Sequence, residues 1–324
     1  MNAYYADDSL TLHHGDALDV ATTLETGSVD CIVTSPPYFG LRDYGEPGQY
    51  GLEATPAEYV ETLRALFSEL RRALAHDGTL WLNLGDTYSG RADSSAGPAG
   101  GRARSDVIPQ RTNTARTLGI KQLLGIPWQV AFALQTDGWV LRSDIIWAKR
   151  NFMPEAVTDR PTRAHEHVFL LTKNTQYWFD ADAIREESDP EQQAHNERYA
   201  KVYAAQSDRA ASTGQPGNNN SAGIHSRPGK PGRNSRDVWT ISSQPFPGAH
   251  FATMPITLAE KCVQAGCRPG GTVLDPFSGS GTTGLAAARH GRKYIGIDLN
   301  AEYLDLSLRT RLAEPGLNFS EVSR

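Results

Sequence analysis

Residues 273 to 284 read Val273-Leu274-Asp275-Pro276-Phe277-Ser278-Gly279-Ser280-Gly281-Thr282-Thr283-Gly284. A short apolar strand is expected to end at Asp275, and the glycine turn after it is expected to open a helix over residues 285–290. Glycines at 279, 281 and 284 match the pattern G-x-G-x-x-G, which lets a backbone turn tightly and approach a ligand closely. The next predicted strand, residues 293–297, ends in Asp298, whose carboxylate can accept from both hydroxyls of a ribose. This order of elements predicts a nucleotide-binding α/β unit.

The ligand of this unit is either a dinucleotide or S-adenosylmethionine. Only 40 residues follow Gly284, which is enough for one helix, one strand and one more helix. The remaining strands of the sheet must therefore come from upstream in the chain. The nucleotide-binding half is C-terminal, and any second half of the site is N-terminal.

A second motif, Thr34-Ser35-Pro36-Pro37-Tyr38, follows the apolar run of residues 29–33 directly. Taken alone, Ser-Pro-Pro is more typical of an ordinary turn. Prolines fix φ and carry no N–H, so the carbonyls around them are stiffly aimed and free to accept hydrogen bonds. Such acceptors beside an aromatic ring suit binding of the exocyclic amino group of a flipped nucleobase.

Hydrophobic periodicity predicts alternating strands and helices along most of the chain. Strands are expected at 10–13, 30–34, 79–84, 139–147 and 168–172, and helices at 56–75 and 128–135. This alternation predicts an α/β fold with a doubly wound, mostly parallel sheet.

The two motifs together resemble the beta-class DNA amino-methyltransferases, a circularly permuted, Rossmann-like arrangement of the S-adenosylmethionine methyltransferase fold. Further stretches that resemble the family are His14-Gly15-Asp16-Ala17-Leu18, residues 81–88, 144–149, 153–155 and 165–173, and His250-Phe251-Ala252-Thr253-Met254-Pro255. The resemblance covers most of residues 10–182 and 250–305.

The resemblance implies a site-specific DNA methyltransferase that moves the methyl group of S-adenosylmethionine to an exocyclic amine of a flipped base in duplex DNA. Family members with Ser before the Pro-Pro pair act mostly on N4 of cytosine, so N4 is expected here. N6 of adenine is the alternative, because related enzymes with a Ser turn can act on adenine. An NAD-dependent oxidoreductase is a weaker alternative, because it leaves the Ser35 motif unexplained.

The resemblance also assigns roles to individual residues. The catalytic turn is Ser35, Pro36, Pro37 and Tyr38, in which the Ser35 hydroxyl and the Pro36 carbonyl accept from the amine and Tyr38 stacks on the base. The residues expected to bind the cofactor are Asp16, Ala17, Phe251, Asp275, Pro276, Phe277, Gly279, Ser280, Gly281, Thr282 and Asp298. Asp16 suits a helix N-cap as well as an adenine contact. Asp275 is expected to bond either loop amides or the donor's ammonium group.

The formal net charge is −5, but basic side chains concentrate in two stretches rich in small residues. Residues 90–124 and 201–240 each carry six basic against two acidic side chains. A solvated surface loop explains such a stretch as well as a DNA contact does. With the resemblance, the expected DNA-binding side chains are Arg227, Lys230, Arg233 and Arg236.

The expected organisation has three parts. Residues 1–183 form the catalytic half with a basic loop at 88–120, residues 184–240 form a target-recognition region, and residues 241–324 form the cofactor half. Double-stranded DNA is the expected partner, and the resemblance also allows a homodimer and a cognate restriction enzyme.

Composition excludes several other classes of protein. No apolar run reaches membrane-spanning length and the N-terminus lacks a signal-peptide pattern, so a cytoplasmic protein is expected. Cys31, Cys262 and Cys267 are too few and scattered for a disulfide framework or a metal site. His165 and His167 share one face of a strand, but no third ligand is evident, so no metal is expected.

Overall fold

The structure is a computed structural model that describes residues 3–90, 117–152, 154–188, 191, 194, 198, 232–244 and 254–312. The chain divides into two compact units. The larger unit comprises Met1–Phe179 with Asp237–Arg324, and the smaller unit comprises Asp180–Arg236. Most of the basic loop expected at 88–120 lies outside the described residues, although Tyr88 and Leu123 pair across its ends.

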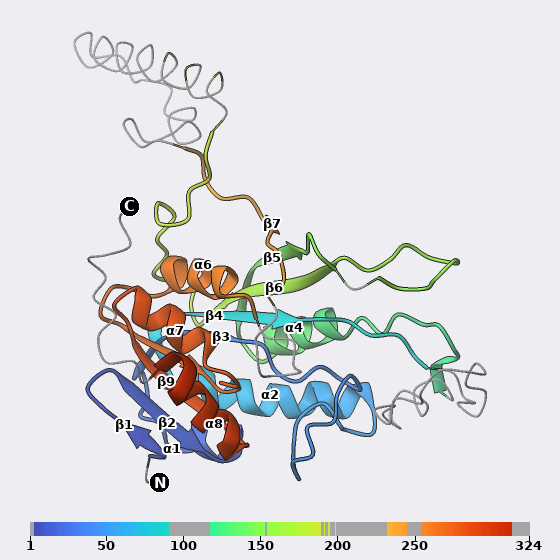
Figure 1. The fold of residues 1–324 in the computed structure, drawn as a ribbon, viewed down its shortest axis with the longest axis horizontal. Coiled ribbons are helices and arrows are strands. Elements are labelled where there is room, and N and C mark those ends of the chain that lie inside the picture. Colours follow the sequence, from blue (N-terminus) through green and yellow to red (C-terminus); the bar gives the residue numbers. More distant parts are fainter. Residues whose placement is uncertain are drawn as a thin grey trace. The chain divides into compact units, whose positions relative to one another are not determined.

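The larger unit contains one sheet with the strand order β1-β2-β9-β8-β3-β4-β6-β5-β7 (Figure 1). Its strands are β1 (Tyr5–Ala6), β2 (Leu10–His14), β3 (Val29–Thr34), β4 (Leu74–Leu84), β5 (Val140–Ala148), β6 (His165–Thr172), β7 (Val238–Thr240), β8 (Thr272–Asp275) and β9 (Lys293–Asp298). The pairs from β2 through β4 and the pair β5–β7 are parallel, whereas β1–β2, β4–β6 and β5–β6 are antiparallel. The predicted mostly parallel α/β sheet is confirmed.

Helices cover both faces of this sheet. They are α1 (Ala17–Thr23), α2 (Pro56–Ala73), α4 (Ile126–Thr136), α6 (Ile256–Gly266), α7 (Thr282–Arg289) and α8 (Ala301–Ser307), followed by the π-helical turn η1 (Leu308–Leu312). In Figure 1, α2 and α4 lie on one side of the central strands and α6 and α7 on the other. Helix α2 is anchored by Tyr59, Leu63, Leu66, Phe67 and Leu70, which are all fully buried. Burial of each such side chain contributes roughly 1.5–3 kcal/mol.

The helix predicted over 56–75 ends two residues early. Thr55 caps its start, where its hydroxyl accepts from the Glu58 amide at 3.2 Å. At its other end, Leu74 already pairs with Val29 in the β3–β4 ladder, and the register then shifts so that Cys31 faces Thr79. Strand pairing therefore overrides helical propensity at residues 74 and 75. The strand predicted to begin at Thr79 begins at Leu74.

The C-terminal strand β8 lies between β9 and the N-terminal strand β3. Cys31 pairs with Val273, and Asp275 pairs with Gly296. The strand before the Ser35 turn and the strand before the glycine turn therefore run parallel and end together. This is the circularly permuted order that the sequence predicts. Within the described part of the chain, no helix is long and apolar enough to span a membrane.

Candidate active site

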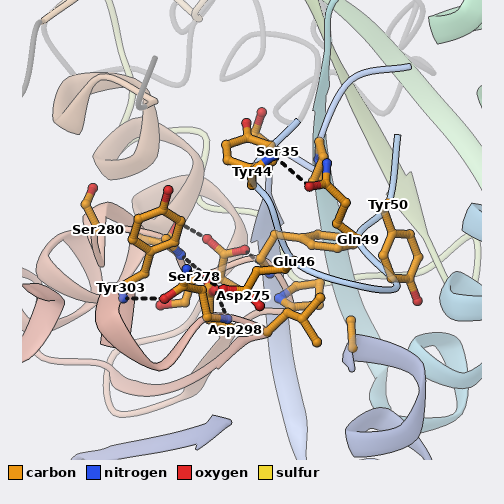
Figure 2. Close-up of a pocket in the computed structure, with 18 of the residues that line it drawn as sticks. Ser35, Tyr44, Glu46, Gln49, Tyr50, Asp275, Ser278, Ser280, Asp298 and Tyr303 are labelled. Atoms are coloured by element: carbon orange, nitrogen blue, oxygen red, sulfur yellow. Dashed lines mark hydrogen bonds between the residues drawn. The ribbon is translucent and has the colours of Figure 1, made fainter. Parts of the chain in front are cut away.

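A pocket opens at the carboxyl ends of β3, β8 and β9, where ligands bind in open α/β sheets (Figure 2). We call it the Asp298 pocket. It is lined by Gly15, Asp16, Ala17, Ser35, Pro37, Tyr44, Glu46, Gln49, Tyr50, Met254, Asp275, Pro276, Phe277, Ser278, Gly279, Ser280, Thr282, Thr283, Asp298, Leu299, Asn300, Tyr303 and Leu306. All but two of the residues predicted to bind the cofactor lie in this wall.

The two exceptions are Gly281 and Phe251. Phe251 lies outside the described residues. Gly281 does not line the pocket; it has a φ of 76° and caps the start of α7. A Cβ there would lie 2.9 Å from Cβ of Ser307, so this glycine is needed for close helix packing. Gly279, with a φ of 50°, does line the pocket, and a Cβ there would meet only the Phe277 carbonyl at 3.9 Å.

Asp298 is half-buried at the end of β9, and both of its oxygens accept backbone hydrogen bonds. Oδ2 accepts from the Gly279 amide at 2.7 Å, and Oδ1 accepts from the Asn300 amide at 2.9 Å. Burial raises the pKa of Asp298, while these amides oppose that shift. The carboxylate is therefore fixed in place and keeps lone pairs for further donors in the pocket.

Asp16 is the N-cap of α1, the alternative that the sequence left open. Its Oδ1 accepts from the amides of Leu18 at 2.9 Å and Asp19 at 3.1 Å. Asp16 also lines the Asp298 pocket, so the cap does not remove it from a ligand's reach. The adenine contact stays a prediction.

Asp275 joins the two motifs. Its Oδ1 accepts from the Thr34 hydroxyl at 2.7 Å and from the Phe277 amide at 3.0 Å, and its Oδ2 accepts from the Thr283 hydroxyl at 2.7 Å. Burial raises the pKa of Asp275 to about 6, although its three donors oppose the shift. Of the two partners predicted for Asp275, the structure shows the loop amide.

The loop of residues 40–53 forms the far wall of the Asp298 pocket, and sequence reasoning missed it. Glu46 accepts from the Asn300 side-chain amide at 2.9 Å, which ties this loop to the end of β9. The Tyr50 ring meets Phe277 edge to face at 5.0 Å. Aromatic and acidic residues between closely spaced glycines were the available signal for this wall.

A second pocket lies on the other side of the Ser35 turn, and we call it the Glu166 pocket. It is lined by Pro36, Pro37, Tyr38, Leu41, Arg42, Tyr44, Asn83, Trp147, Lys149, Glu166, Ser243 and Met254. Pro37, Tyr44 and Met254 line both pockets. Ser35 belongs to the Asp298 pocket, whereas Pro36 and Tyr38 belong to the Glu166 pocket. The predicted catalytic turn is therefore the partition between two cavities.

A hydrogen-bond network converges on the Glu166 carboxylate. Oε2 accepts from the Tyr38 hydroxyl at 2.6 Å and from the Asn83 amide at 3.2 Å, and Oε1 accepts from Lys149 Nζ. Burial and the neighbouring Glu166 charge raise the pKa of Tyr38 well above its usual value. Tyr38 is therefore a protonated donor at neutral pH.

The turn itself is held by its surroundings. Tyr59 donates to the Pro37 carbonyl at 2.8 Å, and the Ser35 hydroxyl lies 3.4 Å from the Tyr38 hydroxyl. Among the residues that the structure describes, none donates to the Pro36 carbonyl. The Pro36 carbonyl and the weakly bonded Ser35 hydroxyl are thus the acceptors left for a ligand.

The residues predicted to bind DNA lie in the smaller unit. Arg227 and Lys230 fall outside the described residues. Arg233 and Arg236 both pair with Glu186, at 3.3 Å and 3.0 Å from Nε to Oε2. The sequence prediction counted the positive charges of these arginines but not the negative charge of Glu186. Their contribution to a positive surface is therefore smaller than predicted.

His165 and His167 pack edge to face, and His167 Nδ1 lies 2.8 Å from Asp144 Oδ1. In the described ranges, no group of three or more His, Cys, Asp or Glu side chains is placed to hold a metal ion. Cys31, Cys262 and Cys267 are buried and unbridged. Burial raises the pKa of the Cys267 thiol to about 12, which leaves it unreactive.

Glu166, Lys149, Asn83 and Trp147 were not predicted as site residues. They come from three different strands or strand ends, and their proximity depends on the register of antiparallel pairs. The available signal was a charged side chain, Glu166, between two histidines at the start of a strand whose residues 168–171 are apolar.

Comparison with known proteins identifies the family. A family model described as DNA methylase, N6_N4_Mtase, matches residues 29–309. The chain is 46% identical to the type II methyltransferase M.Cfr9I of Citrobacter freundii over 92% of this chain and 86% of that protein. It is 42% identical to the type II methyltransferase M.SmaI of Serratia marcescens over 90% of this chain and 87% of that protein.

Solved structures share the fold at low identity. PvuII DNA methyltransferase (cytosine-N4-specific) aligns with a TM-score of 0.62 at 19% identity, over 94% of this chain and 87% of that one. A putative DNA modification methylase of Thermus thermophilus, solved with S-adenosyl-L-methionine, aligns with a TM-score of 0.53 at 23% identity over 92% of each chain. The predictions of a methyltransferase fold and of a DNA-methylating enzyme are confirmed, and the chain belongs to the N6/N4 DNA methylase family.

Proposed function

We propose that this DNA methylase transfers the methyl group of S-adenosylmethionine to the N4 amino group of a cytosine that is flipped out of duplex DNA. One observation carries the proposal. The Ser35-Pro36-Pro37 turn separates two pockets that share Pro37, Tyr44 and Met254. A methyl donor on one side and an acceptor base on the other would meet at this turn.

The Asp298 pocket fits S-adenosylmethionine. Asp298 and Glu46 offer carboxylates for ribose hydroxyls, and the rings of Tyr50 and Phe277 offer an apolar wall for adenine. The open space beside Gly279 permits close approach of the ligand to the backbone. When bound, the cofactor supplies an electrophilic methyl group on its sulfonium.

The Glu166 pocket fits an amine that is a poor nucleophile. The lone pair of an exocyclic amine is delocalised into the aromatic ring, so the enzyme must draw the nitrogen toward tetrahedral geometry. The Ser35 hydroxyl and the Pro36 carbonyl accept the two amine hydrogens and orient the lone pair toward the Asp298 pocket. Tyr38, fixed by Glu166, stacks on the base.

The choice of cytosine rests on Ser35. Enzymes of this type with Ser before the Pro-Pro pair act mostly on cytosine, whereas Asp or Asn there is usual for adenine. The amines of both bases are conjugated to a six-membered ring and fit the same acceptors. N6 of adenine is therefore the competing product.

The experiment is to express the protein in cells that lack other DNA methylases and to separate the nucleosides of their DNA by mass. N4-methyl-2′-deoxycytidine in the wild-type sample, strongly reduced with Ser35→Ala, supports the proposal. N6-methyl-2′-deoxyadenosine alone would overturn the choice of cytosine, and a methyl group on a ring carbon would overturn transfer to an amine. Sequencing the same DNA for modified bases gives the target site.

We also propose residues 184–240 as the target-recognition region, placed between a catalytic half at 1–183 and a cofactor half at 241–324. Arg227 and Lys230 are the side chains to test, because the described arginines nearby pair with Glu186. Changing both to Glu should lower the slope of log K against log salt by about 0.9 per lost phosphate contact. An unaltered slope would contradict a DNA contact.

Three finer expectations accompany this function. The relatives above are type II methyltransferases, which supports a cognate restriction enzyme that cuts the unmethylated target site. Such an endonuclease should fail to cut DNA from cells that express this methylase. A homodimer, tested by sedimentation, and a cytoplasmic location, tested by fractionation, complete the proposal.

A further inference from the structure

We propose that Lys149 recognises the flipped cytosine by donating hydrogen bonds to the acceptors on its Watson–Crick edge, N3 and O2. Glu166 is the positioning residue that holds the ammonium group. The inference rests on the proposed function, because it requires a cytosine in the Glu166 pocket. It adds the determinant of base identity to the residues that grip the amine.

Lys149 follows the end of β5 and lines the Glu166 pocket. Its Nζ donates to Glu166 Oε1 and lies 4.5 Å from the centre of the Trp147 ring. The side chains of Lys149 and Glu166 are only 22% and 14% exposed. The ammonium group is thus fixed between a carboxylate and an aromatic face, and it is largely withdrawn from solvent.

A flipped cytosine needs hydrogen-bond donors from the protein. In duplex DNA, guanine satisfies cytosine N3 and O2, and both acceptors lose these partners when the base leaves the stack. A buried acceptor without a donor costs about 1–3 kcal/mol. The pocket must therefore supply N–H or O–H groups besides the two acceptors that hold the amine.

Most donors of the Glu166 pocket are already engaged within the protein. The Asn83 amide donates to Glu166 and to the His167 carbonyl, and Trp147 Nε1 donates to the Ile241 carbonyl. Tyr38 donates to Glu166. An ammonium group has three hydrogens, and Glu166 takes one, so Lys149 has donors left for two acceptors.

Arg42 and Ser243 also line this pocket, but neither side chain is held between a carboxylate and an aromatic ring as Lys149 is. Arg42 belongs to the loop of residues 40–53, and Ser243 follows the edge strand β7, whereas Lys149 follows β5, which is paired on both sides, with β6 and with β7. A group that discriminates between bases must be held in place before the ligand arrives. The Glu166 bond and the Trp147 contact do this for Lys149.

Lys149 also accounts for discrimination against adenine. Adenine presents a ring nitrogen next to its amine, as cytosine does, but it has a C–H group where cytosine has O2. A donor aimed at O2 would face this C–H group and stay unpaired, which penalises adenine. A donor on N3 also shields the ring nitrogen from methylation.

The test combines a substitution in the protein with a substitution in the DNA. The target cytosine is replaced by 3-deazacytosine, which lacks N3, or by a 2-aminopyridine C-nucleoside, which lacks O2 but keeps the ring nitrogen and the amine. Methyl-transfer kcat/KM is measured for wild type and Lys149→Met on all three substrates. Changes in the amine's reactivity cancel within such a cycle.

We expect Lys149→Met to lower kcat/KM on cytosine by roughly 10–100-fold, the size of a hydrogen bond to a charged group. On at least one analogue the same substitution should cost little, because the acceptor that Lys149 contacts is already gone. If, on both analogues, the fold-loss in kcat/KM caused by Lys149→Met multiplies the fold-loss caused by the base change, Lys149 makes no such contact and the inference is wrong.

Controls separate recognition from folding and from the reaction. Lys261→Met removes a lysine that also lies over a tryptophan, with Nζ 4.3 Å from Trp239, but outside both pockets, and it should behave as wild type. The thermal shift induced by S-adenosylmethionine should persist in Lys149→Met. If it is lost, Lys149→Gln takes the place of Lys149→Met in the same cycle.

The wild-type product separates the two possible failures. N4-methyl-2′-deoxycytidine as the product, together with multiplicative losses, would overturn the role of Lys149 alone. N6-methyl-2′-deoxyadenosine as the wild-type product would overturn the proposed function, and the O2 contact with it.

Discussion

The two pockets that meet at the Ser35 turn were accessible to sequence reasoning to very different degrees. Eight of the residues that line the Asp298 pocket come from the continuous segment 275–283, and this segment supplies most of the lining residues that were predicted. The Glu166 pocket combines residues of four segments: Tyr38 from the turn after β3, Asn83 from β4, Trp147 from β5 and Glu166 from β6. Of the residues that line it, only those of the turn were predicted. The part of a site that one segment carries is visible in the sequence, whereas a part that depends on strand register is not.

The reason is the geometry of the antiparallel part of the sheet. Trp147 lies opposite Glu166 in the β5–β6 ladder, and Asn83 lies opposite Val168 in the β4–β6 ladder. A slip of one residue in either ladder would turn these side chains to the other face of the sheet. No local pattern fixes that register; the packing of the whole sheet does.

The largest expected effect on methyl transfer comes from a change in the Ser35 turn, which separates the two pockets. Ser35→Ala should keep donor affinity and lower the rate of methyl transfer by roughly 10²–10³-fold, the usual cost of one positioned hydrogen bond in a transition state. Single-turnover rates with labelled donor, together with calorimetric titration of the donor, measure both quantities. Ser28→Ala is the matched control, because Ser28 is exposed and its hydroxyl donates to the Glu25 carbonyl at 2.8 Å. Full activity in Ser35→Ala would remove Ser35 from the mechanism.

In the Glu166 pocket, Glu166→Gln should lower kcat/KM for DNA by roughly 10–100-fold, because it removes a charged partner of Lys149. Donor affinity should not change, since Glu166 does not line the Asp298 pocket. DNA kinetics and donor titration on the same preparation test this difference. A weaker donor affinity would mean that the two pockets are not functionally separate.

In the Asp298 pocket, Asp298→Ala should do the opposite of Ser35→Ala: it should weaken donor binding more than it slows methyl transfer. Donor affinity should fall by about 10-fold, as for loss of a hydrogen bond to a charged group, with a smaller effect on the rate at saturating donor. Donor titration measures the first quantity and single-turnover kinetics the second. Unchanged donor affinity would refute the assignment of Asp298 to the ribose.

Sequence reasoning predicted the sheet because apolar runs, glycine turns and proline signals are local. It missed the early end of α2, because the pairing of Leu74 with Val29 is a tertiary effect. It did not predict that Gly281 packs closely against Ser307, because that contact is tertiary. It also missed Glu186, the counterion that pairs with Arg233 and Arg236.

The smallest expected effect concerns Asp275, the residue that joins the two motifs. Burial raises the pKa of Asp275 from 3.8 to about 6, so the folded state binds this proton more tightly than the unfolded state does. The stability from this group is present below about pH 4 and is lost as pH rises through about 6. Between about pH 4 and pH 6, the Tm of the wild type should therefore fall by a few degrees, whereas the Tm of Asp275→Asn should not show this fall. Parallel Tm curves for the two proteins would contradict the raised pKa.

The central claim is that the Ser35 turn separates a donor pocket from a base pocket. A crystal structure with a non-reactive donor analogue and duplex DNA that contains the mapped target site tests it most directly. We predict the analogue against Asp298 and Gly279, and a flipped cytosine in the Glu166 pocket with its amine at the Ser35 hydroxyl and the Pro36 carbonyl. A base bound elsewhere, or an analogue that occupies the Glu166 pocket, would contradict the account.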